Sequence, residues 1–216
     1  MTGLTIDIVS DAVCPWCFLG KRRLEAALRE IGETKAQVRW RPFQLDETIP
    51  VGGLDRVAYM SRKFPDAAQL AAAHERLSAL GGEVGVAFAF DAIRRSPNTL
   101  DAHRLVRWAA AAGRQDAVVE GLFRAYFERG QDVGDNKVLV EIAEGCGMDG
   151  KDVAEGLASN RDVEETSAEI AHWRRAGVNG VPFFIFNGKL ALSGAQPTAT
   201  FVAAMIEARL PAARQG

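Results

Sequence analysis

The sequence predicts an α/β fold in which one small α/β domain, built from residues 1–50 and 177–216, carries a large all-helical insertion, residues 51–176. Three observations predict this division. The first region has the pattern strand, helix, strand, and the last region has the pattern strand, strand, helix. Almost every segment between them has helical periodicity or composition. The two end regions together have the size of one small domain, so we expect them to share a core.

The N-terminal region predicts a βαβ unit. Residues 4–9 alternate and contain several β-branched side chains, which is typical of a strand. The predicted helix after this strand ends at Gly32, because glycine favours the end of a helix. Residues 38–45 alternate again, and Pro42 restricts this second strand to a sheet edge or a bulge. Between the two strands, apolar residues recur at helical spacing, namely Cys17, Leu24, Leu28 and Ile31.

The remaining elements follow from periodicity and from turn residues. Residues 84–90 form a short apolar patch that fits either a strand or a buried loop. Residues 183–186 and 189–193 are predicted strands joined by a hairpin turn at Asn187-Gly188, and residues 198–210 form a last helix. Helices are predicted within the insertion at residues 66–80, 98–112, 116–129, 136–146 and 163–175.

The composition excludes several classes of protein. With 216 residues, 48% of them hydrophobic and 25% charged, the chain has the composition of a soluble globular protein. The net charge is −2 and the basic residues are scattered, which argues against nucleic acid as a partner. No apolar stretch approaches the roughly 20 residues of a membrane span. Residues 1–10 lack the pattern of a signal peptide, so a cytoplasmic location is expected.

Two of the three cysteines, Cys14 and Cys17, form a CxxC motif. Such a motif alone fits half a zinc site, a redox pair or two unrelated buried thiols. A structural zinc site needs four ligands, yet Cys146 stands alone and the histidines are dispersed, at His74, His103 and His172. Pro15-Trp16 lies between the two cysteines at a predicted junction of strand and helix, where backbone N–H groups are free. This placement favours the redox pair and predicts no metal.

The position of the motif assigns a role to each cysteine. A thiolate at the first turn of a helix is stabilised by unpaired N–H groups and by the positive end of the helix dipole, so Cys14 is the predicted nucleophile. Cys17 continues the apolar stripe and should face inward as the resolving thiol, which leaves Cys14 as the exposed one. Trp16 offers a flat apolar surface beside the reactive sulfur. An unfolded polypeptide is one substrate with matching apolar surface.

A second signal is Val181-Pro182, at the start of a predicted strand. An isolated X-Pro bond is usually trans. Together with the CxxC motif, however, a cis bond is the favoured interpretation. Pro182 would then pack close to the cysteine pair without offering a donor, and the backbone of Val181 would be free to pair with an extended substrate.

These motifs together resemble those of the DsbA-type thioredoxin-fold oxidoreductases, and more narrowly their FrnE-like branch. The resemblance implies a thioredoxin-like fold with a large helical insertion, dithiol–disulfide exchange in which Cys14 attacks, and a cis Pro182 beside it. It rests on blocks that span nearly the whole chain: Ser10-Asp11, Cys14-Pro15-Trp16-Cys17, Lys21-Arg22-Arg23, residues 96–103, Gly180-Val181-Pro182-Phe183 and residues 193–197.

The resemblance extends to 2-hydroxychromene-2-carboxylate isomerases and kappa-class glutathione transferases, which bind glutathione. Those relatives carry a serine where this chain has Cys14, which argues against their chemistry here. Periplasmic DsbA proteins have a histidine next to the second cysteine. Trp16 replaces it in this chain, so we expect a disulfide that is less strongly oxidising.

The sequence therefore predicts a thiol–disulfide oxidoreductase of the protein disulfide oxidoreductase or isomerase type, which exchanges disulfides through Cys14 and Cys17. Its predicted partners are protein or peptide disulfides and thiols. No permanently bound cofactor is expected, and glutathione remains open as a weak ligand or redox partner. Two alternatives remain: a glutathione-dependent isomerase or transferase acting on a small aromatic substrate, and a non-catalytic thioredoxin-like binding module. No oligomeric state is predicted.

Several further residues have assigned roles. The predicted substrate-binding residues are Trp16, Val181, Pro182, Asn98 and Gln196. Asn98 opens a predicted helix, so helix capping competes with substrate contact as its role. Gln196 is included only because the resemblance implies that this region binds the γ-glutamyl end of glutathione. Cys146 is interpreted as a small buried hydrophobic residue. Residues 21–23 are interpreted as a solvated helix face.

Overall fold

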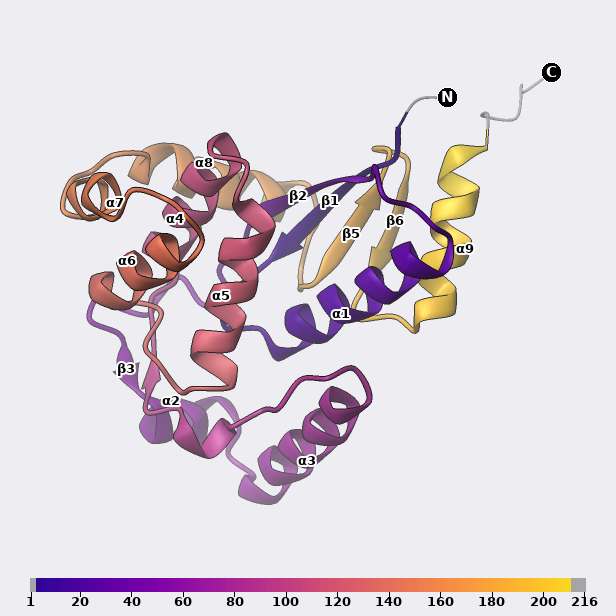
Figure 1. Cartoon of the computed structure of the whole chain (residues 1–216). Helices are drawn as coiled ribbons and strands as arrows, with labels where there is room; N and C mark the ends of the chain where they lie inside the picture. The colour runs from indigo at the N-terminus through magenta and orange to yellow at the C-terminus, as the bar shows by residue number, and fades with distance from the viewer. Residues whose placement is uncertain (1–2, 211–216) are drawn as a thin grey trace.

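A four-stranded mixed sheet forms the centre of the N- and C-terminal regions in the computed structural model, which describes residues 3–210 (Figure 1). Its strand order is β2-β1-β5-β6. β1 runs parallel to β2 and antiparallel to β5, and β5 pairs with β6 in a hairpin. The strands are β1 (Thr5–Ser10), β2 (Gln37–Pro42), β5 (Phe183–Phe186) and β6 (Leu190–Ser193).

The predicted edge strand and hairpin turn are confirmed. Pro42 is the last residue of β2, which lies at one edge of the sheet, so its missing N–H breaks no interior ladder. Asn187 and Gly188 have φ values of 50° and 67°, which suit a two-residue turn between antiparallel strands. The Asn187 side chain accepts a hydrogen bond from Thr5 N at 2.8 Å and donates one to Ala208 O at 3.0 Å. The turn therefore also fixes the start of β1.

Two helices pack side by side against the sheet (Figure 1). They are α1 (Pro15–Glu30) and α9 (Thr198–Arg209). Gly20 allows α1 to approach the sheet closely, because a Cβ atom there would lie 2.9 Å from Phe184 Cζ and 3.2 Å from Pro182 Cγ. Phe184 in turn packs edge-on against Phe201 of α9, with ring centroids 4.7 Å apart. This packing places the start of α1 next to Pro182.

The region between β2 and β5 is almost entirely helical. Residues 84–90 form no strand: they are a loop that leads into the single turn η1. Two short strands and the helices α2 and α7 had no predicted counterpart, since elements of two to eight residues leave little periodicity. The elements are β3 (Leu54–Asp55), α2 (Arg56–Lys63), α3 (Ala67–Glu83), η1 (Phe90–Ala92), β4 (Arg95–Ser96), α4 (Leu100–Ala111), α5 (Gln115–Phe127), α6 (Asn136–Gly145), α7 (Gly150–Leu157) and α8 (Val163–Arg175).

Aspartate side chains begin four of these helices. The carboxylates of Asp55, Asp66, Asp135 and Asp149 accept hydrogen bonds from the first free N–H groups of α2, α3, α6 and α7. Each cap satisfies donors that the helix itself leaves unpaired. The boundaries of the helices are therefore determined locally, by short polar residues just ahead of each one.

Charged residues tie α1 to α5. Lys21 is only 3% exposed, and its Nζ lies 3.1 Å from Asp116 Oδ2, 3.3 Å from Glu120 Oε2 and close to Glu25. The interpretation of residues 21–23 as a solvated helix face is therefore wrong for Lys21. Its pKa is raised because the three nearby carboxylates outweigh the effect of burial, which acts in the opposite direction. Asp116 and Glu120 of α5 therefore hold the helical region against α1, while Glu25 lies on α1 itself.

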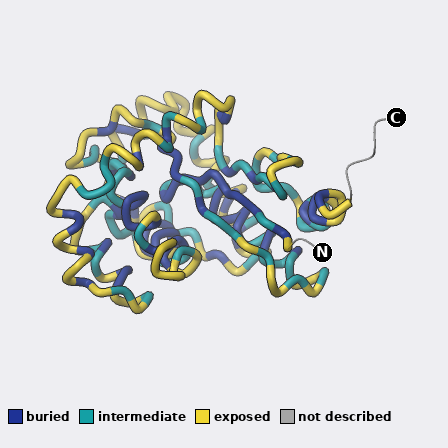
Figure 2. The backbone as a smooth tube through the Cα atoms, turned by 90° about the horizontal axis from the view of Figure 1, so that it is seen from above, coloured by how far each residue is buried: buried dark blue, intermediate teal, exposed yellow. Residues whose placement is uncertain are grey.

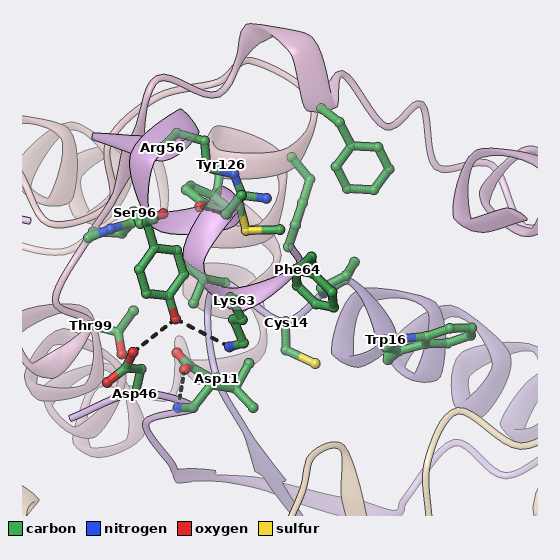
Figure 3. Close-up of a pocket in the computed structure, with 18 of the residues that line it drawn as sticks. Asp11, Cys14, Trp16, Asp46, Arg56, Lys63, Phe64, Ser96, Thr99 and Tyr126 are labelled. Atoms are coloured by element: carbon green, nitrogen blue, oxygen red, sulfur yellow. Dashed lines mark hydrogen bonds between the residues drawn. The ribbon is translucent and has the colours of Figure 1, made fainter. Parts of the chain in front are cut away.

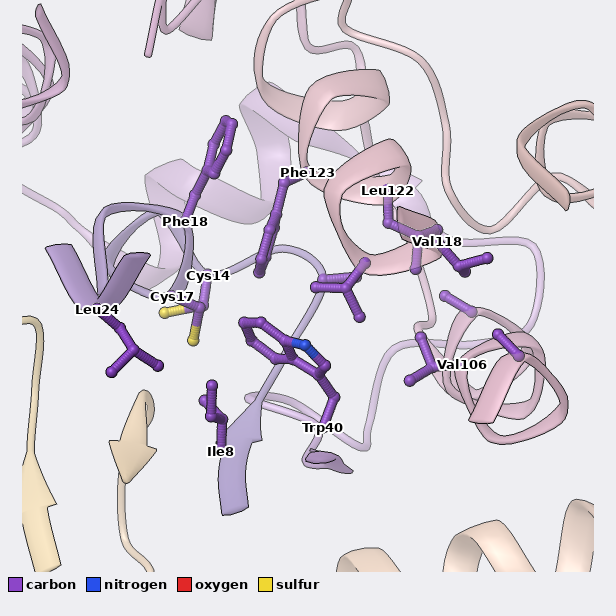
Figure 4. Packing of buried hydrophobic residues seen from close by; sticks show 14 of the residues in the cluster. Ile8, Cys14, Cys17, Phe18, Leu24, Trp40, Val106, Val118, Leu122 and Phe123 are labelled. Atoms are coloured by element: carbon purple, nitrogen blue, oxygen red, sulfur yellow. The ribbon is translucent and has the colours of Figure 1, made fainter. Parts of the chain in front are cut away.

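The sheet and the helical region share one apolar core (Figure 4). Phe18 of α1 stacks on Phe123 of α5 with ring centroids 5.1 Å apart, and Trp40 of β2 meets Phe123 at 6.1 Å. Figure 2 shows buried residues concentrated between the sheet and the helices that face it. The division into two domains stays a prediction, and residues 1–2 and 211–216 of its predicted ranges lie outside the described residues.

Arg104 is the most deeply buried cation of the helical region, with 2% exposure. Its guanidinium donates hydrogen bonds to the carbonyl oxygens of Arg161, Gly156 and Ser159 at 2.7 to 2.8 Å, and to Asp101 Oδ1 at 2.6 Å. It therefore fixes the end of α7 and the loop that follows it on α4.

We expect Arg104→Met to lower the free energy of unfolding by about 3 kcal/mol, because it removes four hydrogen bonds made by a buried guanidinium. Arg107→Met is the matched control on the same helix. Its side chain is 41% exposed and its ion pairs face solvent, so the loss should stay below about 1 kcal/mol. Urea denaturation followed by circular dichroism measures both. Equal losses in the two variants would contradict the role given to Arg104.

Candidate active site

Cys14 occupies the position immediately before α1, as the N-cap residue. Its backbone is extended, and its N–H donates to Asp11 O at 3.1 Å. Its carbonyl accepts from Cys17 N at 3.0 Å, and Pro15 is the first helical residue, where a missing N–H is tolerated. The predicted junction of strand and helix is therefore present, and the Cys14 sulfur lies at the positive end of the α1 dipole.

The Cys14 thiol faces the loop before β5. Its Sγ lies 3.4 Å from Val181 O, to which it donates, although the two residues are 167 positions apart. The Val181–Pro182 peptide bond is cis, and Pro182 is buried. The expectation of an exposed Cys14 is wrong, since the residue is 3% exposed. Sequence reasoning placed it at a helix start but gave no account of the segments that cover it.

Cys17 lies one helical turn further along, buried in the shared core (Figure 4). It is 1% exposed, as the predicted inward-facing thiol should be. Burial raises the pKa of the Cys17 thiol well above its usual range, and a hydrogen bond with Cys14 raises that pKa further. Both thiols are free. The pair thus consists of one thiol at a helix start and one that burial keeps protonated.

A cavity of about 320 Å³ opens beside Cys14 (Figure 3). Trp16 and Val181 also line it, so the structure brings three of the predicted site residues together around one space. The opposite walls come from α2, α3 and the loop that contains Phe90. Most of the lining is apolar, including Val13, Leu45, Met60, Phe64, Leu77 and Phe90. Volume and lining fit a small-molecule or side-chain binding site.

Polar groups are also present in this cavity. Tyr59 OH donates to Asp46 Oδ2 at 3.0 Å and accepts from Lys63 Nζ at 3.2 Å (Figure 3). Burial, followed by the hydrogen bond to Asp46, raises the pKa of Tyr59 to about 12, so it stays a phenol at neutral pH. Asp11 is 1% exposed, and its Oδ2 accepts from Leu45 N at 2.7 Å. A buried carboxylate therefore lies close to the cysteine pair.

Three predicted substrate-binding residues, Pro182, Asn98 and Gln196, lie outside the lining of this cavity. Pro182 is buried and packs against Gly20 of α1. Asn98 uses its side chain within the fold: Oδ1 accepts from Leu100 N and Gln44 Nε2, and Nδ2 donates to Ile49 O. Gln196 Nε2 donates to Ser193 O at 2.7 Å. Asn98 thus binds the first turn of α4, in keeping with a capping role, although Thr99 is the N-cap residue. The roles of all three residues in substrate binding stay predictions.

Cys146 is distant from this chemistry in the fold. It follows α6, is half-buried and lines a separate surface cavity. Burial raises the pKa of its thiol. Among residues 3–210, no group of three His, Cys, Asp or Glu side chains is placed to hold a metal ion. No helix within the same residues is long and apolar enough to cross a membrane.

Sequence reasoning missed the far walls of the cavity. Arg56, Tyr59 and Lys63 line it from α2, and His74 lines it from α3. These positions carry no motif, and they come near Cys14 only through the packing of α2 and α3. The sequence offers one weak indication of this wall. The segment of α2 follows the turn residues Pro50, Gly52 and Gly53, and it places apolar residues beside basic ones.

The raised pKa of Cys17 predicts slow alkylation. Because the thiolate fraction is small at any pH below that raised pKa, iodoacetamide should label Cys17 of a Cys14→Ser variant only slowly at pH 7. The labelling rate should increase only when the pH is above about 8.5, the ordinary pKa of a thiol. Peptide mapping by mass spectrometry separates Cys17 from Cys146. The urea-unfolded variant is the control, and equal labelling rates in folded and unfolded protein would contradict the prediction.

Comparison with known proteins supports the fold and gives the family. A family model described as a DsbA-like thioredoxin domain matches residues 5–205. An uncharacterised protein, YwbO of Bacillus subtilis, is 29% identical over 192 residues, which are 88% of this chain and 90% of that protein. The crystal structure of a probable DsbA oxidoreductase from Streptomyces coelicolor is 30% identical with a TM-score of 0.87, and the match covers 97% of this chain and 93% of that one.

More distant structures share the fold. A 2-hydroxychromene-2-carboxylate isomerase is 16% identical with a TM-score of 0.72, over 94% of this chain and 95% of that one. The cytosolic disulfide reductase DsbM of Pseudomonas aeruginosa, solved with glutathione, is 23% identical with a TM-score of 0.64, over 95% of both chains. The predicted thioredoxin-like fold is therefore confirmed, and the chain belongs to the family of DsbA-like thioredoxin domains.

Proposed function

We propose that the protein is a thiol–disulfide oxidoreductase in which Cys14 attacks a substrate disulfide and Cys17 resolves the mixed disulfide. One observation carries this proposal: Cys14 begins α1, lines a cavity and lies 3.4 Å from Val181 O, while Cys17 is buried one turn behind it. The Cys14 sulfur lies at the N-terminal end of α1, and burial favours the thiol form of Cys17. The two cysteines are thus suited to different steps.

In the first step the Cys14 thiolate attacks one sulfur of a substrate disulfide. A bond forms between Cys14 Sγ and that sulfur, and the other substrate sulfur leaves as a thiolate. The Val181 carbonyl oxygen, which accepts the Cys14 S–H in the free protein, becomes available to a backbone N–H of a peptide substrate. Trp16 lines the same space and offers apolar contact.

In the second step Cys17 gives up its proton and attacks Cys14 Sγ. The Cys14–Cys17 disulfide forms, the second substrate thiol leaves, and two electrons have passed from the protein to the substrate. The Cys17 proton ends on one of the two released thiols. Two molecules of a small thiol such as glutathione would regenerate the dithiol by two such exchanges and leave as their own disulfide. The reverse sequence would oxidise a dithiol substrate.

Protein or peptide disulfides and thiols are the proposed partners, with glutathione as a redox partner or weak ligand. The DsbM structure that shares this fold was solved with glutathione and is named a cytosolic disulfide reductase, which supports both the ligand and a cytoplasmic location. Isomerase or transferase chemistry receives less support, because a second thiol behind Cys14 would resolve any mixed disulfide. A binding module alone would need neither thiol in this arrangement.

The two cysteines should behave differently when replaced. Cys14→Ser should abolish the reduction of insulin disulfides by glutathione, because the attacking sulfur is lost. Cys17→Ser should instead accumulate mixed disulfides with the substrate, because nothing resolves them. Non-reducing gels and mass spectrometry detect the trapped species. Equal trapping by both variants would contradict the assigned roles.

Cys146→Ser is the matched control, since this thiol lines a different cavity from Cys14. It should keep the turnover of the wild-type protein. Lost turnover in this variant would show that a third thiol takes part in exchange.

Reduced glutathione should bind weakly to the Cys14→Ser protein, in which no mixed disulfide with Cys14 can form. Contacts of its peptide backbone with Val181 are the expected source of affinity. Isothermal titration calorimetry at millimolar ligand measures the heat, and S-methylglutathione is the control for contacts that do not involve the thiol. No heat with either ligand would remove glutathione as a direct binding partner.

A further inference from the structure

The cavity beside Cys14 contains a cation that the fold leaves without an anionic partner. Arg56 Nη1 donates to Tyr126 OH at 3.2 Å, and Tyr126 OH in turn donates to Arg95 O at 3.2 Å. Across residues 3–210, no carboxylate oxygen lies within 4 Å of the Arg56 guanidinium. Most of its N–H groups therefore remain available, and Arg56 lines the cavity.

A buried hydroxyl lies in the same part of the cavity. Ser96 is 2% exposed and lines the cavity, yet its Oγ has no hydrogen-bond partner among the described residues. A buried polar group without a partner is unusual in a folded protein. Figure 3 shows Arg56, Tyr126 and Ser96 grouped together. A bound oxyanion could accept from the guanidinium and from this hydroxyl at once.

The remaining charges of the cavity orient such a ligand. Asp11 is buried next to Cys14, with His103 Nε2 3.4 Å from its Oδ1, so that end of the cavity offers an anion a carboxyl group in place of a free cation. Lys63 faces Asp46 through Tyr59, which lowers its attraction for a further anion. His74 lines the cavity as well, and burial and then Arg56 lower its pKa, so it adds no charge at neutral pH. Arg56 is the cation to which an anion would bind.

The walls between the two ends favour a flat apolar body. His74 stacks on Phe90 with ring centroids 4.1 Å apart, and five further rings line the same cavity. Flat rings pack against such surfaces with large contact area and defined geometry. A volume of about 320 Å³ fits a small molecule better than a folded chain segment. The five rings belong to Trp16, Tyr59, Phe64, Tyr126 and Phe127.

We propose that this cavity binds a flat, apolar thiol or disulfide that carries one carboxylate, with the carboxylate on Arg56 and Ser96 and the sulfur at Cys14. The inference rests on the proposed function, because it names the class of substrate that the exchange reaction would accept in addition to peptide disulfides. The end near Asp11 takes the uncharged, sulfur-bearing part of the molecule. The end at Arg56 takes the acid.

Calorimetry with thioether analogues tests the binding without any redox step. The probes are meta-(methylthio)benzoate and its uncharged match, meta-(methylthio)benzamide, titrated into the reduced full chain. The acid should bind at least about tenfold more tightly than the amide, as charge-assisted hydrogen bonds to a partly buried guanidinium predict. The bound acid should also slow the alkylation of Cys14 by iodoacetamide, which places it beside that thiol.

Variants of α2 identify the residue responsible. Arg56→Met should remove the preference for the acid, whereas Arg56→Lys keeps the charge and should retain part of it. Arg62→Met is the matched control, because Arg62 is exposed on the same helix and lies outside the cavity lining. Circular dichroism checks that each variant is folded. If Arg56→Met fails to fold, the affinities of the wild-type protein for acid and amide still decide the question.

Three results would overturn this inference: equal affinity of the wild-type protein for acid and amide, a preference that survives in folded Arg56→Met, or binding that leaves Cys14 alkylation unchanged. The proposed function is judged separately, by turnover of insulin disulfides. Turnover without a preference for the acid would refute only the carboxylate site. A preference for the acid without turnover of any disulfide would refute the proposed function and leave the carboxylate site.

Discussion

The antiparallel pairing of β1 with β5 is the constraint on which the rest of the site depends. Val9 pairs with Phe183, so the chain that leaves β1 toward Cys14 passes beside the chain that enters β5 through Val181. The hydrogen bond from Cys14 Sγ to Val181 O is a direct consequence. Gly20 then allows α1 to lie against Phe184 and Pro182, which fixes the helix start next to the same loop.

The helical region completes the site because it packs on that start. Lys21 is held by acidic side chains of α1 and α5, and Phe18 stacks on Phe123, so the first turns of α1 lie in the core that the sheet and the helical region share. This packing buries Cys17 and raises its pKa. The Cys14 thiol is left facing a cavity between the two regions instead of bulk solvent, so α2 and α3 line the space through which a molecule would reach it.

The charges around this cavity differ in how far the fold neutralises them. Lys63 and Asp46 are joined through hydrogen bonds to Tyr59. Arg56, by contrast, donates to the neutral Tyr126 hydroxyl, and the Ser96 hydroxyl has no hydrogen-bond partner among the described residues. Stable proteins rarely leave buried polar groups without partners unless a ligand or water supplies them. The specificity of the site is therefore expected to come from the helical region, and its redox chemistry from the sheet and α1.

The sequence by itself determined the elements whose signals are local: the strand before Cys14, the helix after it, the hairpin at Asn187-Gly188 and the inward position of Cys17. Turn residues, caps and periodicity act over a few positions, so they can be recognised without a fold. The burial of Cys14, the buried ion pairs of Lys21 and the placement of Arg56 in the cavity depend on segments tens to more than a hundred residues apart. Only tertiary packing brings those segments together. A local sequence pattern does not predict which distant segment a side chain will contact.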